Sequence, residues 1–362
     1  MKTVLVTGAG GPLGVNFCRS LRASGESLRL IGTDANRWHL PLSLCDETYL
    51  IPFAKHREEY RQALVEIAQS ESVDVIIPTH PVEVRAVAEL RDAGSLGNMK
   101  TALPATSILN VTDDKAKTQA ALLKAGLPVP KTQLLHNEDD VQNAFAELRY
   151  LDGPVWVRGS GAPGLGIGGA ALPCRSVGVA LSWIEHYNGF GKMAASEYLP
   201  GDNLSWMALF SHGELVASGA RERLEYVLPH VSPSGITGAP AVSRTIDNPL
   251  LADMGERAVR AIDASAHGVY FVDFKGDREN RPCITEINGG RCGTTIHFYT
   301  EAGCNFPQLL TQLATEGGLA PLANARSCIA PGQYWVRTLD CGPALVRDSD
   351  FDSYPRAGLE VT

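Results

Sequence analysis

The sequence lacks the features that mark membrane, secreted and nucleic-acid-binding proteins. No apolar run approaches the length of a membrane span, and no long apolar core of a signal peptide follows Met1. No block of basic residues occurs, and the formal net charge is −8. A negatively charged chain without a basic patch is a poor partner for a phosphate backbone. We therefore expect a cytoplasmic protein that binds neither a membrane nor a nucleic acid.

The chain also lacks the cysteine spacings of a metal site or a disulfide scaffold. Its eight cysteines are scattered without a Cys-x-x-Cys pair, and there is no His-Glu-x-x-His segment. This distribution argues against a structural zinc site and suits a reducing compartment. No internal repeat or low-complexity tract is present. The 362 residues are enough for two or three domains.

The first 110 residues alternate apolar strands with helices, which predicts a parallel sheet covered on both faces. The first turn carries Gly8, Gly11 and Gly14, and Asp34 ends the second strand. This pattern is typical of a dinucleotide site with a pyrophosphate at a helix N-terminus. However, no tyrosine has the lysine four residues on that epimerases and reductases with such a turn use. The alternative is a tight turn that needs glycine for its backbone geometry and for close helix packing.

A polar helix and a glycine-rich loop follow. The helix is predicted to be capped by Thr112 or Asp113, with Lys115 near its start. Further on, a strand ends in Arg158, and six glycines lie within residues 159–169. Such a loop can fold over a triphosphate and present backbone N–H groups, with the arginine as a fixed cation. A solvated helix lysine and a flexible hairpin tip are the ordinary alternatives.

Two later strands carry groups suited to a base and to an anion. Glu197 lies on a mostly apolar strand, where it could accept from an exocyclic amine, and Asp202 is close enough in sequence to meet a ribose. Arg221 and Arg223 follow the strand Leu215–Gly219 and point the same way if that strand continues. Paired arginines suit recognition of a carboxylate. A surface salt-bridge pair explains them equally well.

Residues 269–291 predict two short strands joined by a polar turn. Symmetric pairing about that turn places Asp273 directly opposite Glu286, and alternation puts Asn288 on the same face. Like charges opposite each other destabilise a sheet unless something neutralises them. Two carboxylates and an amide suit Mg²⁺, which prefers a few carboxylates plus substrate phosphates. The alternative is an exposed hairpin with solvated acids.

In this order the segments resemble the ATP-grasp superfamily over about residues 1–315. The matching pieces are an Asp-Lys helix, a basic residue before a glycine-rich loop, a Glu-Tyr-Leu hinge followed by Pro-Gly, and Glu-x-Asn with a nearby arginine. The nearest likeness is to the carbamoyl-phosphate synthase large chain and amino-acid ligases, in which the glycine turn need not bind NAD. The resemblance implies an α/β (α+β grasp) fold. It would comprise a doubly wound parallel-sheet pre-grasp domain (1–110), two α+β subdomains that clasp ATP (111–195 and 196–330) and C-terminal strands with a tail (331–362).

The resemblance also implies a role for each matching residue. Asp273, Glu286 and Asn288 would hold Mg²⁺, two ions being expected and Mn²⁺ an alternative. ATP would be bound by Lys115, Arg158, Gly159, Ser160, Gly161, Gly164, Gly166, Glu197, Tyr198, Leu199 and Asp202. Arg291 would contact the transferred phosphate, and Arg221 and Arg223 would join it in holding the substrate carboxylate or its acyl phosphate. The chain departs from the family in having Arg158 for lysine, and Gly-Gly-Arg where Pro-Arg is common, which leaves the placement of Arg291 open.

These roles imply an ATP-dependent carboxylate–amine ligase that forms an amide or peptide bond through an acyl phosphate and releases ADP and phosphate. The substrates would be a small carboxylate and an amine, with amino acids as candidates, and a homodimer is the default assembly. The sequence leaves two other activities open: an NAD(P)-dependent reductase or epimerase that uses the N-terminal turn, and an ATP-grasp kinase that phosphorylates a hydroxyl or enol. A non-catalytic nucleotide sensor is disfavoured, since it has no need of a full metal site.

Overall fold

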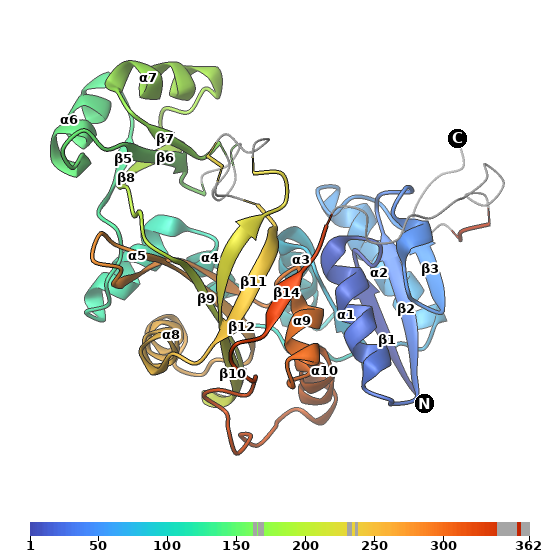
Figure 1. Ribbon diagram of the computed structural model, residues 1–362. Coiled ribbons are helices and arrows are strands. Elements are labelled where there is room, and N and C mark those ends of the chain that lie inside the picture. The colour runs from blue at the N-terminus through green and yellow to red at the C-terminus, as the bar shows by residue number, and fades with distance from the viewer. Residues whose placement is uncertain (162–164, 166–169, 230–233, 236–237, 339–352, 356–362) are drawn as a thin grey trace.

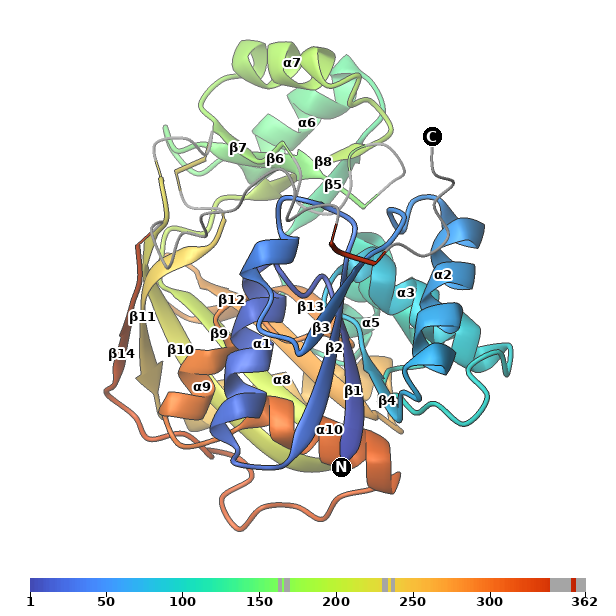
Figure 2. The ribbon, with the colours of Figure 1, turned by 90° about the vertical axis from the view of Figure 1, so that its right-hand side faces the viewer.

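Three sheets organise the residues that the computed structural model describes, which are 1–161, 165, 170–229, 234–235, 238–338 and 353–355 (Figure 1). A parallel N-terminal sheet lies beside a six-stranded large sheet, and a small sheet lies above the large one (Figure 2). Within these ranges, no helix has both the length and the apolar character needed to cross a bilayer. The domain limits expected from the sequence remain predictions.

The N-terminal sheet is parallel, as the alternation of strands and helices predicts, and its order is β3-β2-β1-β4. Its elements are β1 (Lys2–Thr7), α1 (Pro12–Ala23), β2 (Leu28–Asp34), the 3-10 turn η1 (Leu40–Leu42), β3 (Glu47–Leu50), α2 (Arg57–Ser70), β4 (Val75–Ile77) and α3 (Pro81–Asp92). Alternate residues of β1 face opposite sides. Val4 and Val6 pack with the apolar residues of α1, and Leu5 packs with those of α2 and α3.

The small sheet is antiparallel in the order β5-β8-β6-β7. Its strands are β5 (Thr132–Leu135), β6 (Val155–Gly159), β7 (Leu172–Cys174) and β8 (Met193–Glu197), and its helices are α6 (Glu138–Leu148) and α7 (Val177–His186). Val155 and Val157 are buried with the apolar side chains of both helices. The strand period of two then directs Trp156 and Arg158 to the other face of the sheet.

The large sheet is antiparallel in the order β13-β12-β9-β10-β11-β14. Its strands are β9 (Asn203–Ser211), β10 (Glu214–Tyr226), β11 (Pro240–Ile246), β12 (Gly268–Gly276), β13 (Pro282–Gly289) and β14 (Tyr334–Val336), and its helices are α8 (Pro249–Ile262), α9 (Ile296–Glu301) and α10 (Phe306–Glu316). Helix α8 packs on one face, while α9 and α10 lie between the other face and α1 (Figure 2). One apolar core therefore joins the large sheet to the N-terminal sheet.

The structure corrects the predicted start of the polar helix. Helix α5 (Lys115–Lys124) is capped by Asp114, whose carboxylate accepts from two backbone N–H groups of its first turn. Thr112 and Asp113 instead end a separate short helix, α4 (Thr106–Thr112), which the sequence did not predict. A helix of only seven residues shows too little apolar periodicity to be recognised. Of the segment 331–362, expected to form C-terminal strands and a tail, residues 339–352 and 356–362 lie outside the described residues.

Candidate active site

The hairpin of β12 and β13 has the predicted register from Tyr270 to Asp273, but not in the part next to its turn. Asp273 lies opposite Glu286, and this pairing is followed by a β-bulge, because Phe274 pairs with Ile284. The bulge leaves Thr285 without a cross-strand partner in β12, and its carbonyl accepts from Arg158 of the small sheet at 3.4 Å. An irregularity of this kind frees a backbone group for another role. The bulge thus connects the two sheets beside the acidic pair.

Asp273 and Glu286 are each paired with a cation from another element. The Lys115 Nζ atom, at the start of α5, lies 3.2 Å from a Glu286 carboxylate oxygen. Arg223 of β10 pairs with Asp273. All four side chains are mostly buried, between 14% and 25% exposed. The like charges predicted to face each other are therefore neutralised by separate cations, and the exposed-hairpin alternative is wrong.

The charges of this cluster alter one another's pKa values. Burial lowers the pKa of Lys115 to about 8, with Arg158 acting in the same direction and Glu286 opposing both. For Glu286, burial favours the neutral acid, but Lys115 and Arg158 outweigh it, and the pKa is lowered. Burial raises the pKa of Asp273 against the opposing effect of Arg223. At neutral pH Lys115 is therefore mainly an ammonium and Glu286 a carboxylate.

Arg221 is a buried guanidinium that forms an ion pair with no acid of the described residues. It is 2% exposed, its Nε atom donates to the Ser205 hydroxyl at 3.2 Å, and a second nitrogen donates to the Thr295 hydroxyl. Its central carbon lies 5.6 Å from the centre of the Phe271 ring. Neutral hydroxyls satisfy donors but do not balance the charge. The sequence placed Arg221 and Arg223 on one strand face, and β10 continues through both.

Arg291, the third predicted arginine, follows a glycine turn that places it beside the acidic hairpin. Arg291 donates to the Asn288 side-chain oxygen at 2.6 Å. Gly290 has a φ of +79°, and a Cβ there would lie 2.7 Å from a methyl group of Val84. Glycine is therefore required at 290 for both the left-handed backbone and the close approach of α3.

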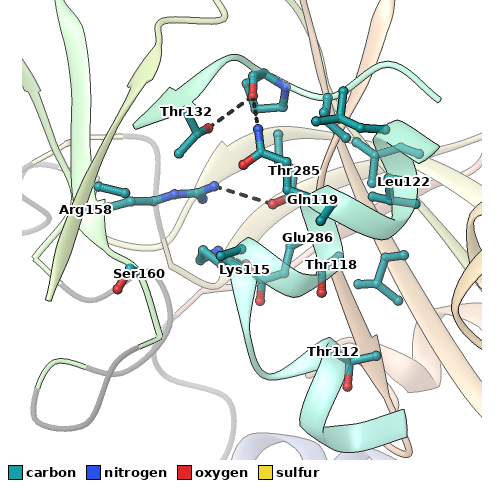
Figure 3. A pocket seen from close by; sticks show the side chains of 18 of the residues that line it. Thr112, Lys115, Thr118, Gln119, Leu122, Thr132, Arg158, Ser160, Thr285 and Glu286 are labelled. Atoms are coloured by element: carbon teal, nitrogen blue, oxygen red, sulfur yellow. Dashed lines mark hydrogen bonds and ion pairs between the residues drawn. The ribbon is translucent and has the colours of Figure 1, made fainter. Parts of the chain in front are cut away.

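Three cavities surround this cluster. The first, of about 270 Å³, lies between α5 and the small sheet, and Figure 3 shows Lys115 and Glu286 side by side among its lining residues, with Arg158 reaching toward Thr285. The second, of about 190 Å³, lies along the segment after β8, and Arg158, Thr285 and Glu286 line it too. The third, of about 230 Å³, we call the arginine pocket, since Arg221, Arg223 and Arg291 line it together with Asp273, Glu286 and Asn288. Glu286 thus lines all three cavities, and Asp273 lines the second and the third.

Of the residues predicted to bind the base and the ribose, only some line a cavity. Glu197, Tyr198 and Leu199 line the second cavity. One oxygen of Glu197 already accepts from the backbone N–H of Lys131 at 2.9 Å. Asp202 does not line this cavity; it is exposed and pairs with the side chain of Asn280 at 2.8 Å.

Sequence reasoning missed several side chains that line the second cavity, among them Trp156, Asn203 and Lys275. Trp156 lies two residues before Arg158 on β6, and Lys275 lies two residues after Asp273 on β12. A strand period of two applied to the residues already chosen would have found both.

The glycine-rich loop is described only at its ends. Gly159 ends β6, and the N–H and hydroxyl of Ser160 both donate to the Lys192 carbonyl at 2.9 Å. Gly161 has a φ of +100°, which favours glycine. Gly164 and Gly166 lie outside the described residues.

The donor set fits Mg²⁺ better than a softer metal. The described residues contain no cluster of three or more His, Cys, Asp and Glu side chains. A metal at the hairpin would therefore rely on Asp273, Glu286, Asn288 and oxygens of a bound phosphate. Mg²⁺ commonly binds one or two carboxylates plus substrate phosphates, and the residues present fit that preference.

The N-terminal glycine turn is packed against its own domain. Asp34 accepts from the N–H groups of Gly10 at 3.1 Å and Asn36 at 2.9 Å. A Cβ on Gly10 would lie 1.9 Å from the His39 carbonyl oxygen. The chain thus occupies the space beside this turn and uses the acid that a ribose would need. This geometry favours the packing role for the glycines.

Comparisons with known proteins agree on the fold. No family model matches the chain. The carbamoyl phosphate synthase large chain of Campylobacter jejuni subsp. jejuni serotype O:2 is 23% identical over 183 residues, which cover 46% of this chain. The match spans only 16% of that protein's length.

Solved structures match nearly the whole chain. Biotin carboxylase from Campylobacter jejuni, in a β,γ-ATP complex, has a TM-score of 0.67 at 17% identity and covers 92% of this chain and 74% of its own. L-amino acid ligase from Bacillus licheniformis has a TM-score of 0.64 at 16% identity, covering 92% and 78%. N5-carboxyaminoimidazole synthase from Aspergillus clavatus, in complex with ADP and 5-aminoimidazole ribonucleotide, has a TM-score of 0.64 at 18% identity, covering 90% and 79%. The chain therefore has the ATP-grasp fold, and the resemblance in its sequence is confirmed at that level.

Proposed function

We propose that this protein, which has the ATP-grasp fold, is an ATP-dependent carboxylate–amine ligase that forms an amide or peptide bond and releases ADP and phosphate. One observation carries the proposal: the acidic pair Asp273 and Glu286 lies among cations that outnumber it. Lys115 and Arg223 pair with the two acids, whereas Arg221 forms no ion pair with an acid in the described part of the chain. Buried positive charge without a protein counter-charge favours an anionic ligand.

The nucleotide would lie across the first two cavities. Its phosphates would be held by Lys115 of α5 and Arg158 of the small sheet, while its base would lie near Tyr198 and Leu199. Mg²⁺ bound by Asp273, Glu286 and Asn288 would neutralise the phosphate oxygens. The cations of the chain orient the phosphate for in-line attack, since phosphoryl transfer depends on position and electrostatics more than on a protein nucleophile.

The substrate carboxylate would enter the arginine pocket. Arg221 and Arg291 would aim one carboxylate oxygen at the terminal phosphorus, and the product is an acyl phosphate plus ADP. An amine then attacks the acyl carbon, phosphate leaves, and an amide forms. The pocket volume of about 230 Å³ suits a reactant of amino-acid size. Amino acids are therefore the first substrates to test, and a homodimer remains the default assembly.

The test is an ADP-release assay across pairs of amino acids, with mass spectrometry of the products. The proposal expects ADP release that needs both a carboxylate and an amine, together with a condensed product one water lighter than the pair. ADP release with a phosphorylated hydroxyl would favour the kinase alternative. Tight NAD(P)H binding without any ADP release would favour the reductase alternative.

A further inference from the structure

Two cysteines outside the proposed site lie side by side in the N-terminal sheet domain. Cys18 is on α1, and Cys45 lies in the loop before β3. Their sulfur atoms are 3.6 Å apart, both thiols are free, and Cys45 is only partly buried. A disulfide bond is about 2.05 Å long, so about 1.5 Å of approach separates this contact from a covalent bond.

The loop that carries Cys45 is held against α1 on both sides of the cysteine. Arg22, one helical turn after Cys18, donates to the Leu44 carbonyl at 3.3 Å and pairs with Asp46 at 2.6 Å. Moving Cys45 away from Cys18 would break contacts of both its sequence neighbours. The thiols are therefore kept in contact by groups that take no part in the sulfur chemistry.

The two thiols differ in the direction of their pKa shifts and in their burial. Contact with Cys18 lowers the pKa of Cys45, burial opposes this, and Ser43 and Arg22 reinforce it. The same contact and burial raise the pKa of Cys18. The thiolate is the nucleophilic form, and Cys45 is also the less buried of the two residues. Cys45 is thus suited to attack an oxidant, and Cys18 to resolve the product.

We propose that Cys18 and Cys45 form an intramolecular disulfide when the protein meets a hydroperoxide, with Cys45 as the attacking sulfur. The Cys45 sulfur attacks the outer peroxide oxygen, the O–O bond breaks, and water or an alcohol leaves, which yields a sulfenic acid. The Cys18 sulfur then attacks the Cys45 sulfur and the S–O bond breaks. The departing hydroxide takes the Cys18 proton and leaves as water. The two thiols lose two electrons in total, and these electrons reduce the peroxide.

A second thiol pair in the chain provides an internal control. Cys304 and Cys328 are also in hydrogen-bond contact, but both are buried. A hydroperoxide therefore has no direct access to either sulfur. The two pairs share the thiol–thiol contact and differ in exposure.

The test treats the reduced full-length protein with stepwise equivalents of hydrogen peroxide, then alkylates it and maps the peptides by mass spectrometry. We expect a Cys18–Cys45 cross-link as the first product, reversed by dithiothreitol, while Cys304 and Cys328 remain alkylated. Cys18→Ser should stop Cys45 at a sulfenic acid that dimedone traps, Cys45→Ser should leave Cys18 reduced, and Cys304→Ser should keep the cross-link. Cys18 and Cys45 that both stay alkylated at doses that oxidise other cysteines would overturn the proposal. So would Cys45 oxidation without a cross-link.

Discussion

The glycine turn of the N-terminal sheet and the acidic hairpin of the large sheet both hold buried carboxylates, but their surroundings differ. At the turn, Asp34 accepts from two backbone N–H groups, and Glu83 accepts from the Thr7 hydroxyl and the His80 N–H. At the hairpin, Glu286 pairs with Lys115 of α5 and Asp273 pairs with Arg223 of β10, while Arg158 of β6 donates to the backbone carbonyl of the adjacent Thr285.

The partners of these carboxylates distinguish a region that is fully packed from a region that is suited to bind a ligand. Carboxylates whose oxygens already accept from neighbouring N–H and hydroxyl groups require no ligand to complete their hydrogen bonds. A cluster with more buried cations than acids retains an uncompensated charge, which is costly in a dry interior until an anion arrives. The glycine turn should therefore respond to mutation mainly in stability, and the hairpin mainly in catalysis.

Glu286→Gln should have the largest effect. The amide keeps the shape but removes the charge that pairs with Lys115 and would hold the metal. We expect kcat/KM for ADP release to fall by at least ~1,000-fold, which corresponds to about 4 kcal/mol. The matched control is Glu279→Gln, since Glu279 lies in the exposed turn of the same hairpin. A folded Glu286→Gln variant with full turnover would contradict the proposed function.

Gly10→Ala should affect stability instead. The added methyl group would meet the His39 carbonyl at 1.9 Å, and we expect a loss of about 3 kcal/mol in the free energy of unfolding. Urea titration measures this loss, while calorimetry at a temperature where the variant stays folded should give the wild-type ADP affinity. Gly178→Ala is the control, because a Cβ there has no heavy atom within 4 Å. Weakened ADP binding by the folded Gly10→Ala variant would contradict the assignment of the glycine turn to stability and of the hairpin to ligand binding.

Arg221→Met tests whether the buried guanidinium serves a ligand. The variant should raise the KM for the carboxylate about 100-fold, or about 2.7 kcal/mol, because an arginine contact to an anion is lost. Stability should change little or increase, since methionine has no charge to desolvate. Arg244→Met is the control, because Arg244 is 42% exposed and pairs with Glu222. Severe destabilisation with an unchanged KM would show that Arg221 is structural.

Glu83 provides a smaller, pH-dependent test of the packed turn. Burial raises its pKa from 4.5 to about 7, with hydrogen bonds such as that from Thr7 opposing the shift. The folded state therefore binds this proton more tightly than the unfolded chain. Its stabilisation is complete below pH 4.5 and is lost as pH rises through 7, which amounts to about 2 kcal/mol between pH 5 and 7. Urea unfolding at several pH values measures this. Between pH 5 and 7 the free energy of unfolding should fall less steeply with pH for Glu83→Gln than for the wild type. An equal dependence on pH in both proteins would refute this assignment.

The pairing of Asp273 with Glu286 could be predicted because a short hairpin fixes its own register. The turn sets an approximate centre, and alternation then assigns Asp273, Glu286 and Asn288 to one face, although the bulge between Asp273 and Phe274 was not predicted. The parallel N-terminal sheet could be predicted for a similar reason, since strand and helix periods are local. The ATP-grasp fold followed from the order of such local segments.

Contacts between segments distant in sequence could not be predicted in this way. No local pattern indicates that Glu197 would bond to the Lys131 N–H, or that Asp202 would turn to Asn280 and away from the cavity. The packing of the glycine turn involves the backbone of His39, which lies about thirty residues later in the sequence and contacts Gly10. Such contacts arise from tertiary packing, which one segment alone does not determine.

Photolabelling with 8-azido-ATP and Mg²⁺, followed by peptide mapping, tests most directly where the nucleotide binds. The account predicts label on the peptides that contain Trp156, Tyr198 or Leu199, and protection of those peptides by unmodified ATP. ATP-protected label on the peptide of residues 8–14, or on that of residues 34–39, would contradict it.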